Sequence, residues 1–239
     1  MGSTRLPGKV LSDIGGIASL ECQINRVRQS RFIDEIIIAS TENPLDDAIA
    51  EFGRLIKCKV YRGSEEDVLK RILSASESLN ADIQVQLTGD CPLVDPAIID
   101  ELIEFIIKNE EYDFASNEME RTYPIGLDCR VFKVSALKKA DVLCSDPIHR
   151  VHGSTYLYTS ENKHLFKCKN FKAPQSLYYP KWRWTLDTPE DHLFLEEIFI
   201  FFGKKIFNAS SLEIANFLNH NPNILKLNMD IKQKSIEEG

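Results

Sequence analysis

The six residues EIIIAS (35–40) form a short apolar run between polar neighbours, which is typical of a strand buried on both faces of a sheet. Two similar runs lie at 57–61 and 82–87. Helical patterns separate and follow these runs, at 46–52, 65–79 and 96–108. The order strand, helix, strand, helix, strand, helix predicts an α/β fold with a mostly parallel, doubly wound, Rossmann-like sheet and helices on both faces.

The remainder of the chain continues with shorter elements. Strand patterns lie at 113–117, 127–134 and 183–186, and helical patterns at 17–27, 135–144, 189–202 and 211–218. No linker rich in Gly, Ser or Pro and no repeat interrupts them, so residues 1–239 are expected to form one domain. Residues 220–239 are polar, and we expect them to form a surface tail.

The composition excludes several classes of protein. A net charge of −7 opposes nucleic-acid binding, which depends on clustered Lys and Arg. No apolar run reaches the roughly 18 residues that span a membrane, and residues 1–9 contain no apolar signal core. The six cysteines lie far apart without a Cys-x-x-Cys pair, so we expect reduced thiols and a cytoplasmic protein.

The N-terminal segment GSTRLPGK (2–9) combines glycine, small hydroxyls and two cations. Backbone N–H groups approach phosphate closely at glycine, and Arg5 and Lys9 can neutralise its charge. The spacing differs from that of a Walker loop, because five residues separate Gly2 from Gly8 and Val10 follows Lys9. The segment is thus either a phosphate-binding loop or a flexible terminus with ordinary surface charges.

Two acidic loops follow predicted strands. In QLTGDCPLVDP (86–96), Asp95 precedes Pro96 as a helix N-cap, and Asp90 remains at the strand end. In RWTLDTPED (183–191), Thr188 is the expected N-cap, which leaves Asp187 without a structural role. Ligands of open α/β sheets collect at the carboxyl ends of strands. Two isolated carboxylates suit Mg²⁺, which takes one or two protein carboxylates plus substrate phosphates.

Taken together, these segments resemble the cytidylyltransferases that make CMP-activated sugar acids, including the acylneuraminate and 3-deoxy-manno-octulosonate cytidylyltransferases. The resemblance is greatest to the branch named after spore coat polysaccharide biosynthesis protein F. Six segments carry it in family order: GSTRLPGKVL (2–11), IDEIIIAST (33–41), YRGSEEDVLKRI (61–72), QLTGDCPLVDPAIID (86–100), RTYPIGLDCRVF (121–132) and RWTLDTPEDHLFLEEIF (183–199).

The resemblance implies the fold of the nucleotide-diphospho-sugar transferases and the transfer of CMP from CTP to a sugar acid, with release of pyrophosphate, in surface polysaccharide or glycoconjugate biosynthesis. It implies that the opening loop binds the triphosphate and that two aspartates hold Mg²⁺. The residues to which it assigns these roles are Ser3, Arg5 and Lys9 for the triphosphate, Arg62, Gly63 and Ser64 near the nucleotide, and Asp90 and Asp187 for the metal. Arg5, Lys9, Asp90 and Asp187 are thereby the expected catalytic residues.

The sequence gives several candidates for the residue that binds the acceptor, and the resemblance indicates the oligomeric state. A sugar acid needs a cation, and Arg121, Arg130 and Arg150 are candidates that the sequence does not rank against each other or against solvated surface arginines. The family is often dimeric. We therefore expect a homodimer, with a small dimerisation extension at 117–171.

The sequence departs from the family pattern at its start. The resemblance implies a strand ahead of residue 2, and that first strand, usually central in a doubly wound sheet, is missing from this sequence. Its loss would expose the edges of neighbouring strands. Our hypothesis is that Met1 is an internal methionine of a longer chain that supplies the strand.

Two other functions stay open. The first is a nucleotide-sugar-dependent glycosyltransferase, although these enzymes typically use an Asp-x-Asp metal motif, which the sequence lacks. The second is an N-terminally truncated, non-catalytic paralogue, which the missing strand favours and the retained Arg5, Lys9, Asp90 and Asp187 oppose.

Overall fold

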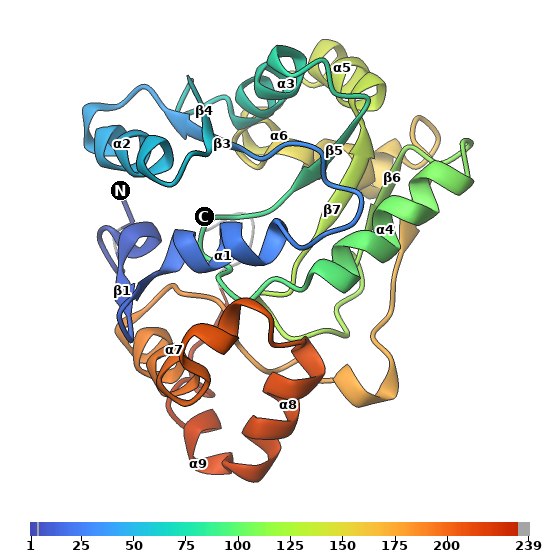
Figure 1. Ribbon diagram of the computed structural model, residues 1–239. Coiled ribbons are helices and arrows are strands. Elements are labelled where there is room, and N and C mark those ends of the chain that lie inside the picture. Colours follow the sequence, from blue (N-terminus) through green and yellow to red (C-terminus); the bar gives the residue numbers. More distant parts are fainter. Residues whose placement is uncertain (4, 234–239) are drawn as a thin grey trace.

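The computed structural model describes residues 1–3 and 5–233, and it has the predicted α/β architecture (Figure 1). The strands are β1 (Asp13–Ile14), β2 (Ile17–Ala18), β3 (Ile37–Thr41), β4 (Lys59–Gly63), β5 (Ile83–Gln86), β6 (Phe114–Ser116), β7 (Arg130–Lys133) and β8 (Cys168–Asn170). The α-helices are α1 (Ser19–Val27), α2 (Asp47–Leu55), α3 (Val68–Ser78), α4 (Pro96–Lys108), α5 (Val134–Leu143), α6 (Pro147–Val151), α7 (Pro189–Phe202), α8 (Ser211–His220) and α9 (Pro222–Leu225).

Helix starts follow the capping residues that the sequence predicts. The Asp95 carboxylate accepts a hydrogen bond from the Ala97 N–H at 2.9 Å, and α4 begins at Pro96. Thr188 caps α7 in the same way, in a reciprocal capping box with Asp191. Both caps are confirmed, because capping depends on residues only two or three positions apart.

Two pairings between very short strands were not predicted. The β1–β2 hairpin turns at Gly15 and Gly16, and β8 pairs in parallel with β6. The predicted strand at 183–186 is wrong: within the described residues this segment makes a single bridge, from Arg183 to Ile125. Strands this short have too few residues to show a two-residue alternation, so their partners decide their conformation.

The strands form two larger sheets. In one, β3 and β4 pair in parallel. In the other the order is β5-β7-β6-β8, with β7 antiparallel to both neighbours, so β5, β6 and β8 run in one direction. Figure 1 shows α3 and α5 above the strands and α1 and α4 below them. This arrangement confirms the predicted α/β sheet with helices on both faces.

The two sheets are not joined to each other. One edge of β3 pairs with β4 and one edge of β5 pairs with β7, while within residues 1–3 and 5–233 no backbone hydrogen bond links β3 to β5. All four residues of β5 are partly exposed, and so are four of the five residues of β3. Among the described residues, the facing edges of β3 and β5 therefore have no ladder partner.

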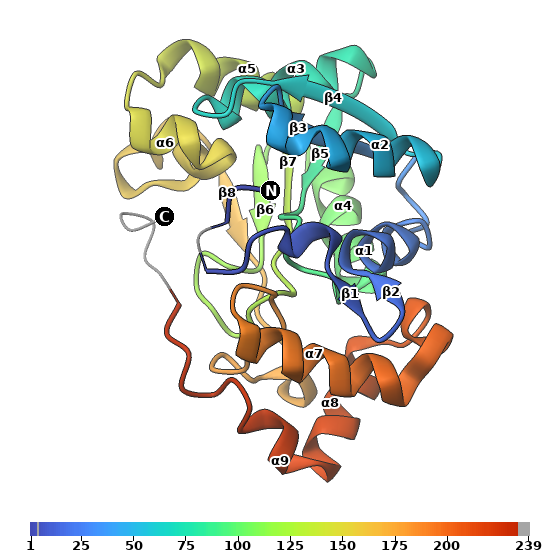
Figure 2. The same ribbon diagram turned by 90° about the vertical axis from the view of Figure 1, so that its left-hand side faces the viewer.

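Two hydrophobic clusters lie on opposite faces of the four-stranded sheet. Leu69, Phe132 and Leu137 belong to the cluster beneath α3 and α5. Leu102, Trp184 and Phe194 belong to the larger cluster, which α4, α7 and α8 share. Figure 2 shows α7, α8 and α9 as an outer layer at the bottom of the molecule. The helix α7 thus fixes the segment that precedes it, which contains Asp187, against the centre of the fold.

The last part of the described chain contains a short helix and a buried residue, Asn228. The predicted surface tail at 220–239 begins with the short helix α9, and residues 234–239 lie outside the described residues. No helix in the part of the chain that the structure describes has the length and apolar character needed to cross a membrane.

Candidate active site

Lys9 lies between the two predicted metal-ligand residues. Its Nζ is 2.7 Å from Asp90 Oδ2 and 2.6 Å from Asp187 Oδ1. Lys9 begins the short 3₁₀ helix Lys9–Leu11, and the preceding Gly8 has φ of 73°, a conformation that favours glycine. The structure therefore brings together the basic loop and both acidic loops, which are far apart in the sequence.

Backbone contacts hold the two acidic loops side by side. The carbonyl oxygen of Asp90 accepts hydrogen bonds from the Leu186 N–H at 2.8 Å and from Thr185 Oγ1 at 3.1 Å. Asp90 lies in the loop that follows β5, and Asp187 immediately precedes α7. Because main-chain groups make the shorter contact, the backbone largely sets the distance between the two loops.

Asp187 has a structural contact that the sequence analysis missed. Its Oδ2 is 3.2 Å from Nη2 of Arg183, a buried residue that also pairs with Asp191. The expectation that Asp187 has no structural role is therefore wrong. The spacing of four residues between Arg183 and Asp187 was the available signal, but on a non-helical segment it does not imply contact.

The charges at this site stabilise one another. Burial by itself lowers the pKa of Lys9, but the carboxylates of Asp90 and Asp187 outweigh it, and the pKa is raised above its ordinary value. Burial by itself raises the pKa of Asp90, but Lys9 outweighs it, and the pKa is held below its ordinary value. At neutral pH the ammonium and the Asp90 carboxylate are both charged.

The pair of carboxylates fits a divalent cation. Oxygens of Asp90 and Asp187 already contact one positive centre, the Lys9 ammonium, and Asp187 is almost fully buried. Carboxylate oxygens are the ligands that Mg²⁺ prefers, and two of them leave positions for phosphate oxygens and water. No cluster of three or more His, Cys, Asp or Glu in the described residues suits a metal, so a denser site for zinc or calcium is not found there.

The other residues of the basic loop lie beside this centre. Arg5 Nη2 is 3.4 Å from Asp187 Oδ2, and the Arg5 side chain is 31% exposed, so its guanidinium can also meet a ligand. Ser3 Oγ accepts a hydrogen bond from the Leu6 N–H at 3.4 Å, which shapes the turn. Thr4 lies outside the described residues.

Arg62, Gly63 and Ser64 lie at the end of β4 and make local contacts. Arg62 donates to the carbonyl oxygens of Thr41 and Asn43 and pairs with Asp47. Ser64 Oγ accepts from the Asp67 N–H at 3.0 Å. Of the eight predicted site residues, the structure groups Arg5, Lys9, Asp90 and Asp187 through direct contacts, with Ser3 in the same turn. The role of residues 62–64 at the nucleotide stays a prediction.

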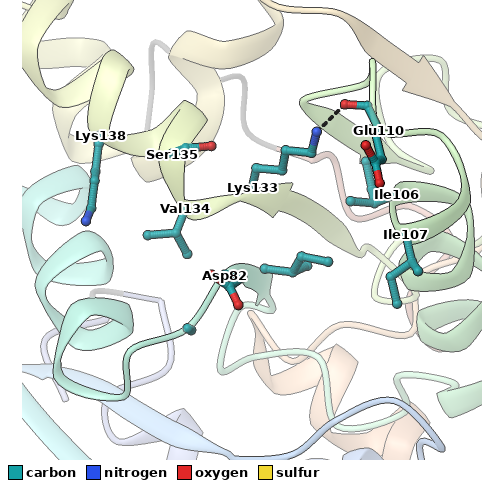
Figure 3. Close-up of a pocket in the computed structure, with 10 residues that line it drawn as sticks. Asp82, Ile106, Ile107, Glu110, Lys133, Val134, Ser135 and Lys138 are labelled. Atoms are coloured by element: carbon teal, nitrogen blue, oxygen red, sulfur yellow. Dashed lines mark hydrogen bonds between the residues drawn. The ribbon is translucent and has the colours of Figure 1, made fainter.

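A separate cavity of about 550 Å³ lies elsewhere on the same sheet. Figure 3 shows its apolar residues, Ile106, Ile107 and Val134, beside the charged Asp82 and Lys133. The cavity adjoins the start of β5, whereas Asp90 follows the end of that strand. It is therefore distinct from the candidate active site.

Comparison with known proteins assigns the family. The cytidylyltransferase family model matches residues 1–205. The chain is 35% identical to the uncharacterized protein MJ1063 of Methanocaldococcus jannaschii, covering 99% of this chain and 94% of that protein. It is 31% identical to the spore coat polysaccharide biosynthesis protein SpsF of Bacillus subtilis, covering 93% and 92%.

A solved structure agrees with this assignment. A cytidylyltransferase from Leptospira borgpetersenii serovar Hardjo-bovis superimposes with a TM-score of 0.88 at 32% identity, covering 98% of this chain and 95% of that one. The family model covers the loops that carry Lys9, Asp90 and Asp187, and the two relatives and this structure each match most of the chain. The protein therefore belongs to the cytidylyltransferase family.

Proposed function

We propose that the protein transfers CMP from CTP to a sugar acid, with Mg²⁺ held by Asp90 and Asp187, and releases pyrophosphate. The observation that carries the proposal is that both carboxylates contact a single cationic centre, at 2.7 and 2.6 Å, beside the basic loop. Family membership supports the cytidylyl transfer. The resemblance to cytidylyltransferases that activate sugar acids supports the acceptor class.

In this reaction a hydroxyl oxygen of the acceptor forms a bond to the α-phosphorus of CTP. The bond from that phosphorus to the bridging oxygen breaks, pyrophosphate leaves with its electron pair, and the hydroxyl loses its proton. Catalysis depends mainly on alignment and on charge neutralisation. When bound, Mg²⁺ supplies a positive charge that polarises the α-phosphate and favours deprotonation of the hydroxyl.

The protein's own residues divide the remaining work. Asp90 and Asp187 fix the place of the reacting phosphate. Lys9 and Arg5 supply positive charge to the leaving pyrophosphate, and Lys9 exchanges its carboxylate partners for phosphate oxygens when the nucleotide binds. Arg183, which is buried against Asp187 and Asp191, keeps the Asp187 carboxylate in position.

The direct test measures pyrophosphate release by the wild type with CTP, Mg²⁺ and a panel of sugar acids, with UTP and ATP as competing nucleotides. We expect release with CTP, at least a hundredfold loss in D90N and D187N, and weaker CTP binding in K9M, as for removal of charged groups from a transition-state site. Transfer from a preformed nucleotide sugar to a glycan would instead identify a glycosyltransferase. Absence of CTP binding in calorimetry would identify a non-catalytic paralogue.

We also propose that the protein forms a homodimer through α5 and α6. Four apolar side chains are exposed within ten residues there, namely Val142, Leu143, Ile148 and Val151, and they lie inside the predicted extension at 117–171. Exposed apolar patches of this kind mark protein–protein contacts. Light scattering should show a dimer for the wild type and a monomer for V142E/I148E. The variant L55E, at an isolated exposed leucine on α2, should remain dimeric.

A cytoplasmic location and a place in surface polysaccharide or glycoconjugate biosynthesis stay predictions. The SpsF relative carries spore coat polysaccharide biosynthesis in its name, which favours a pathway of that type.

A further inference from the structure

Two ion pairs form a charge network close to Asp90. Arg121 binds Asp128 through two nitrogens, with Nη1 2.6 Å from Oδ1 and Nη2 3.3 Å from Oδ2. Arg130 donates through Nε to Glu118, and both of these side chains are largely buried. The network carries two positive and two negative charges. Buried ion pairs contribute little net stability compared with apolar residues of the same size, so stability alone does not account for it.

The backbone places Asp128 beside the candidate active site. The Ile125 N–H donates to the Trp182 carbonyl at 2.9 Å, and the Trp184 N–H donates to the Ile125 carbonyl at 2.7 Å. Gly126 follows with φ of 100°, and a Cβ there would be only 2.6 Å from the Trp184 carbonyl carbon. The segment that leads to Asp128 thus packs against residues 183–186, and Thr185 and Leu186 of that segment bond to the Asp90 carbonyl oxygen.

The Asp128 carboxylate is held in this turn. Its Oδ2 accepts a hydrogen bond from the Gly126 N–H at 3.5 Å, and Gly126 packs on the Trp184 backbone. Leu186, two residues further along that segment, donates to the Asp90 carbonyl oxygen. The Arg121–Asp128 pair therefore borders the site on this side.

The structure ranks the three arginines that the sequence left unranked. Arg150 donates to Asp67, to Asp141 and to the Cys144 carbonyl, so its guanidinium joins α3 to the segment after α5 and has no group left for a ligand. Arg130 is 16% exposed and lies between Glu118, the His152 carbonyl and the Tyr158 ring. It is a positioning residue.

Arg121 differs from both. Its side chain is 29% exposed, and Asp128 is its hydrogen-bond partner among the residues that the structure describes. Its remaining N–H groups are therefore available. A guanidinium binds a carboxylate through two parallel hydrogen bonds, while aspartate oxygens accept bonds from sugar hydroxyls.

We infer that the Arg121–Asp128 pair is the acceptor subsite, in which Arg121 binds the carboxylate of the sugar acid and Asp128 accepts hydrogen bonds from its hydroxyls. This inference rests on the proposed function and deepens it. Asp90, Asp187, Asp128 and Glu118 each already have a cationic partner, so an anionic acceptor needs a guanidinium with N–H groups to spare. Arg121 supplies that positive charge and is therefore a determinant of acceptor specificity.

The experiment compares acceptors that differ only in charge. We use 3-deoxy-manno-octulosonate and N-acetylneuraminate, each with its methyl ester, and follow pyrophosphate release at saturating CTP. The wild type should prefer each acid to its ester. R121Q should raise the KM for the acid by roughly tenfold to a hundredfold, as expected for lost charge-assisted hydrogen bonds, and should abolish the preference. The KM for CTP should stay within about twofold, since Arg121 makes no hydrogen bond or ion pair with the described residues of the basic loop, 1–3 and 5–9.

Two further variants separate specificity from stability. R121K keeps the charge without the planar fork and should recover part of the affinity for the acid. R150Q removes the arginine that joins α3 to α5 and should leave the acceptor KM of the folded protein unchanged. Equal turnover of acid and ester by the wild type, an intact preference in R121Q, or an equal increase in the KM for CTP would overturn the inference.

Calorimetry with CTP distinguishes a failure of the Arg121 assignment from a failure of the proposed function. If the wild type binds CTP but accepts no sugar acid, the assignment of Arg121 is wrong and the nucleotide site stands. If CTP does not bind, the proposed function is wrong, and the acceptor subsite is lost with it.

Discussion

The N–H of Leu186 donates a hydrogen bond to the carbonyl oxygen of Asp90 at 2.8 Å, and this contact sets the distance between the two acidic loops. Residue 187 follows directly, so the Asp187 carboxylate lies beside that of Asp90, and both contact Lys9. A main-chain contact of this kind persists when either side chain is changed. Substitutions at the carboxylates therefore test chemistry with little disturbance of the backbone.

Asp90 and Asp95 lie in one loop and should respond to mutation in opposite ways. D90N should lower turnover at least a hundredfold and lose only the stability that the Asp90 charge contributes through Lys9, because Asn keeps the shape of the side chain and removes its charge. D95A should retain turnover but lose about 2–4 kcal/mol of stability. Asp95 caps α4 and also accepts from the N–H and Oγ of Ser211.

The measurements are pyrophosphate release and denaturant unfolding of both variants. A D90N protein that keeps its activity, or a D95A protein as stable as the wild type, would show that the two aspartates have been assigned the wrong roles.

The Lys9 contacts should make stability depend on pH at both extremes. The pKa of Asp90 is lowered from 3.8, so its contribution is complete above about pH 3.8 and is lost as the pH falls through the folded-state pKa. The pKa of Lys9 is raised from 10.5, so its contribution is complete below that pH and is lost as the pH rises through the folded-state pKa.

K9M removes both contributions at once. The difference in thermal midpoint between wild type and K9M should therefore be greatest between about pH 4 and pH 10 and should shrink on either side. Thermal melts in matched buffers measure it. A difference that stays constant from pH 2.5 to pH 6 would contradict the lowered pKa of Asp90.

G126A should be strongly destabilising, by about 3 kcal/mol or more. Its φ is 100°, and the new Cβ would meet the Trp184 backbone at 2.6 Å, so the segment 183–186 has to move. Because that segment bonds to the Asp90 carbonyl, turnover should fall as well. The matched control is G2A, where a Cβ meets nothing within 4 Å and φ is not positive. Equal stability of the two variants would show that the close packing at residue 126 is not required.

The unpaired edges of β3 and β5 should accept an added strand. The Met1 amino group is 2.5 Å from Asp46 Oδ1, and Asp46 also bonds to Ser40 and Thr41 at the end of β3. Residues added ahead of Met1 can therefore run parallel to β3 along the open edge. An engineered extension of five alternating Val and Ile should raise the thermal midpoint by roughly 5 °C, because apolar burial exceeds the cost of ordering.

The control extension carries a proline at its third position, which removes a backbone N–H that would donate a hydrogen bond to the neighbouring strand. Calorimetric melts of both extended proteins measure the effect. Equal midpoints for the two extensions would mean that no strand is added between β3 and β5.

The features that the sequence predicts correctly are those that depend on interactions between residues close together in the chain. Pro96 and Pro189 begin helices as predicted, because caps and helical periodicity depend on neighbours within a few residues. The 183–186 segment, predicted as a strand, makes one bridge to Ile125. Its conformation depends on partners more than fifty positions away, which local patterns do not specify.

The same distinction between short-range and long-range interactions applies to the candidate active site. Glycine-rich and strand-end patterns made Lys9, Asp90 and Asp187 candidates, and the family resemblance implied their roles. The involvement of Arg183 was not, since its pairing with Asp187 requires a bend in the chain. The ranking of Arg121 above Arg150 was also beyond the sequence, because it depends on which carboxylates lie within reach of each guanidinium.

Sequence alone determined the α/β class, the helix starts and the chemical groups available for catalysis, because these follow from periodicity and side-chain chemistry over short stretches. Tertiary structure decided that two distant carboxylates share one cation, that the sheet is divided between β3 and β5, and that Arg121 pairs with Asp128. These outcomes depend on contacts between segments many residues apart, and only the packing of the whole chain selects them.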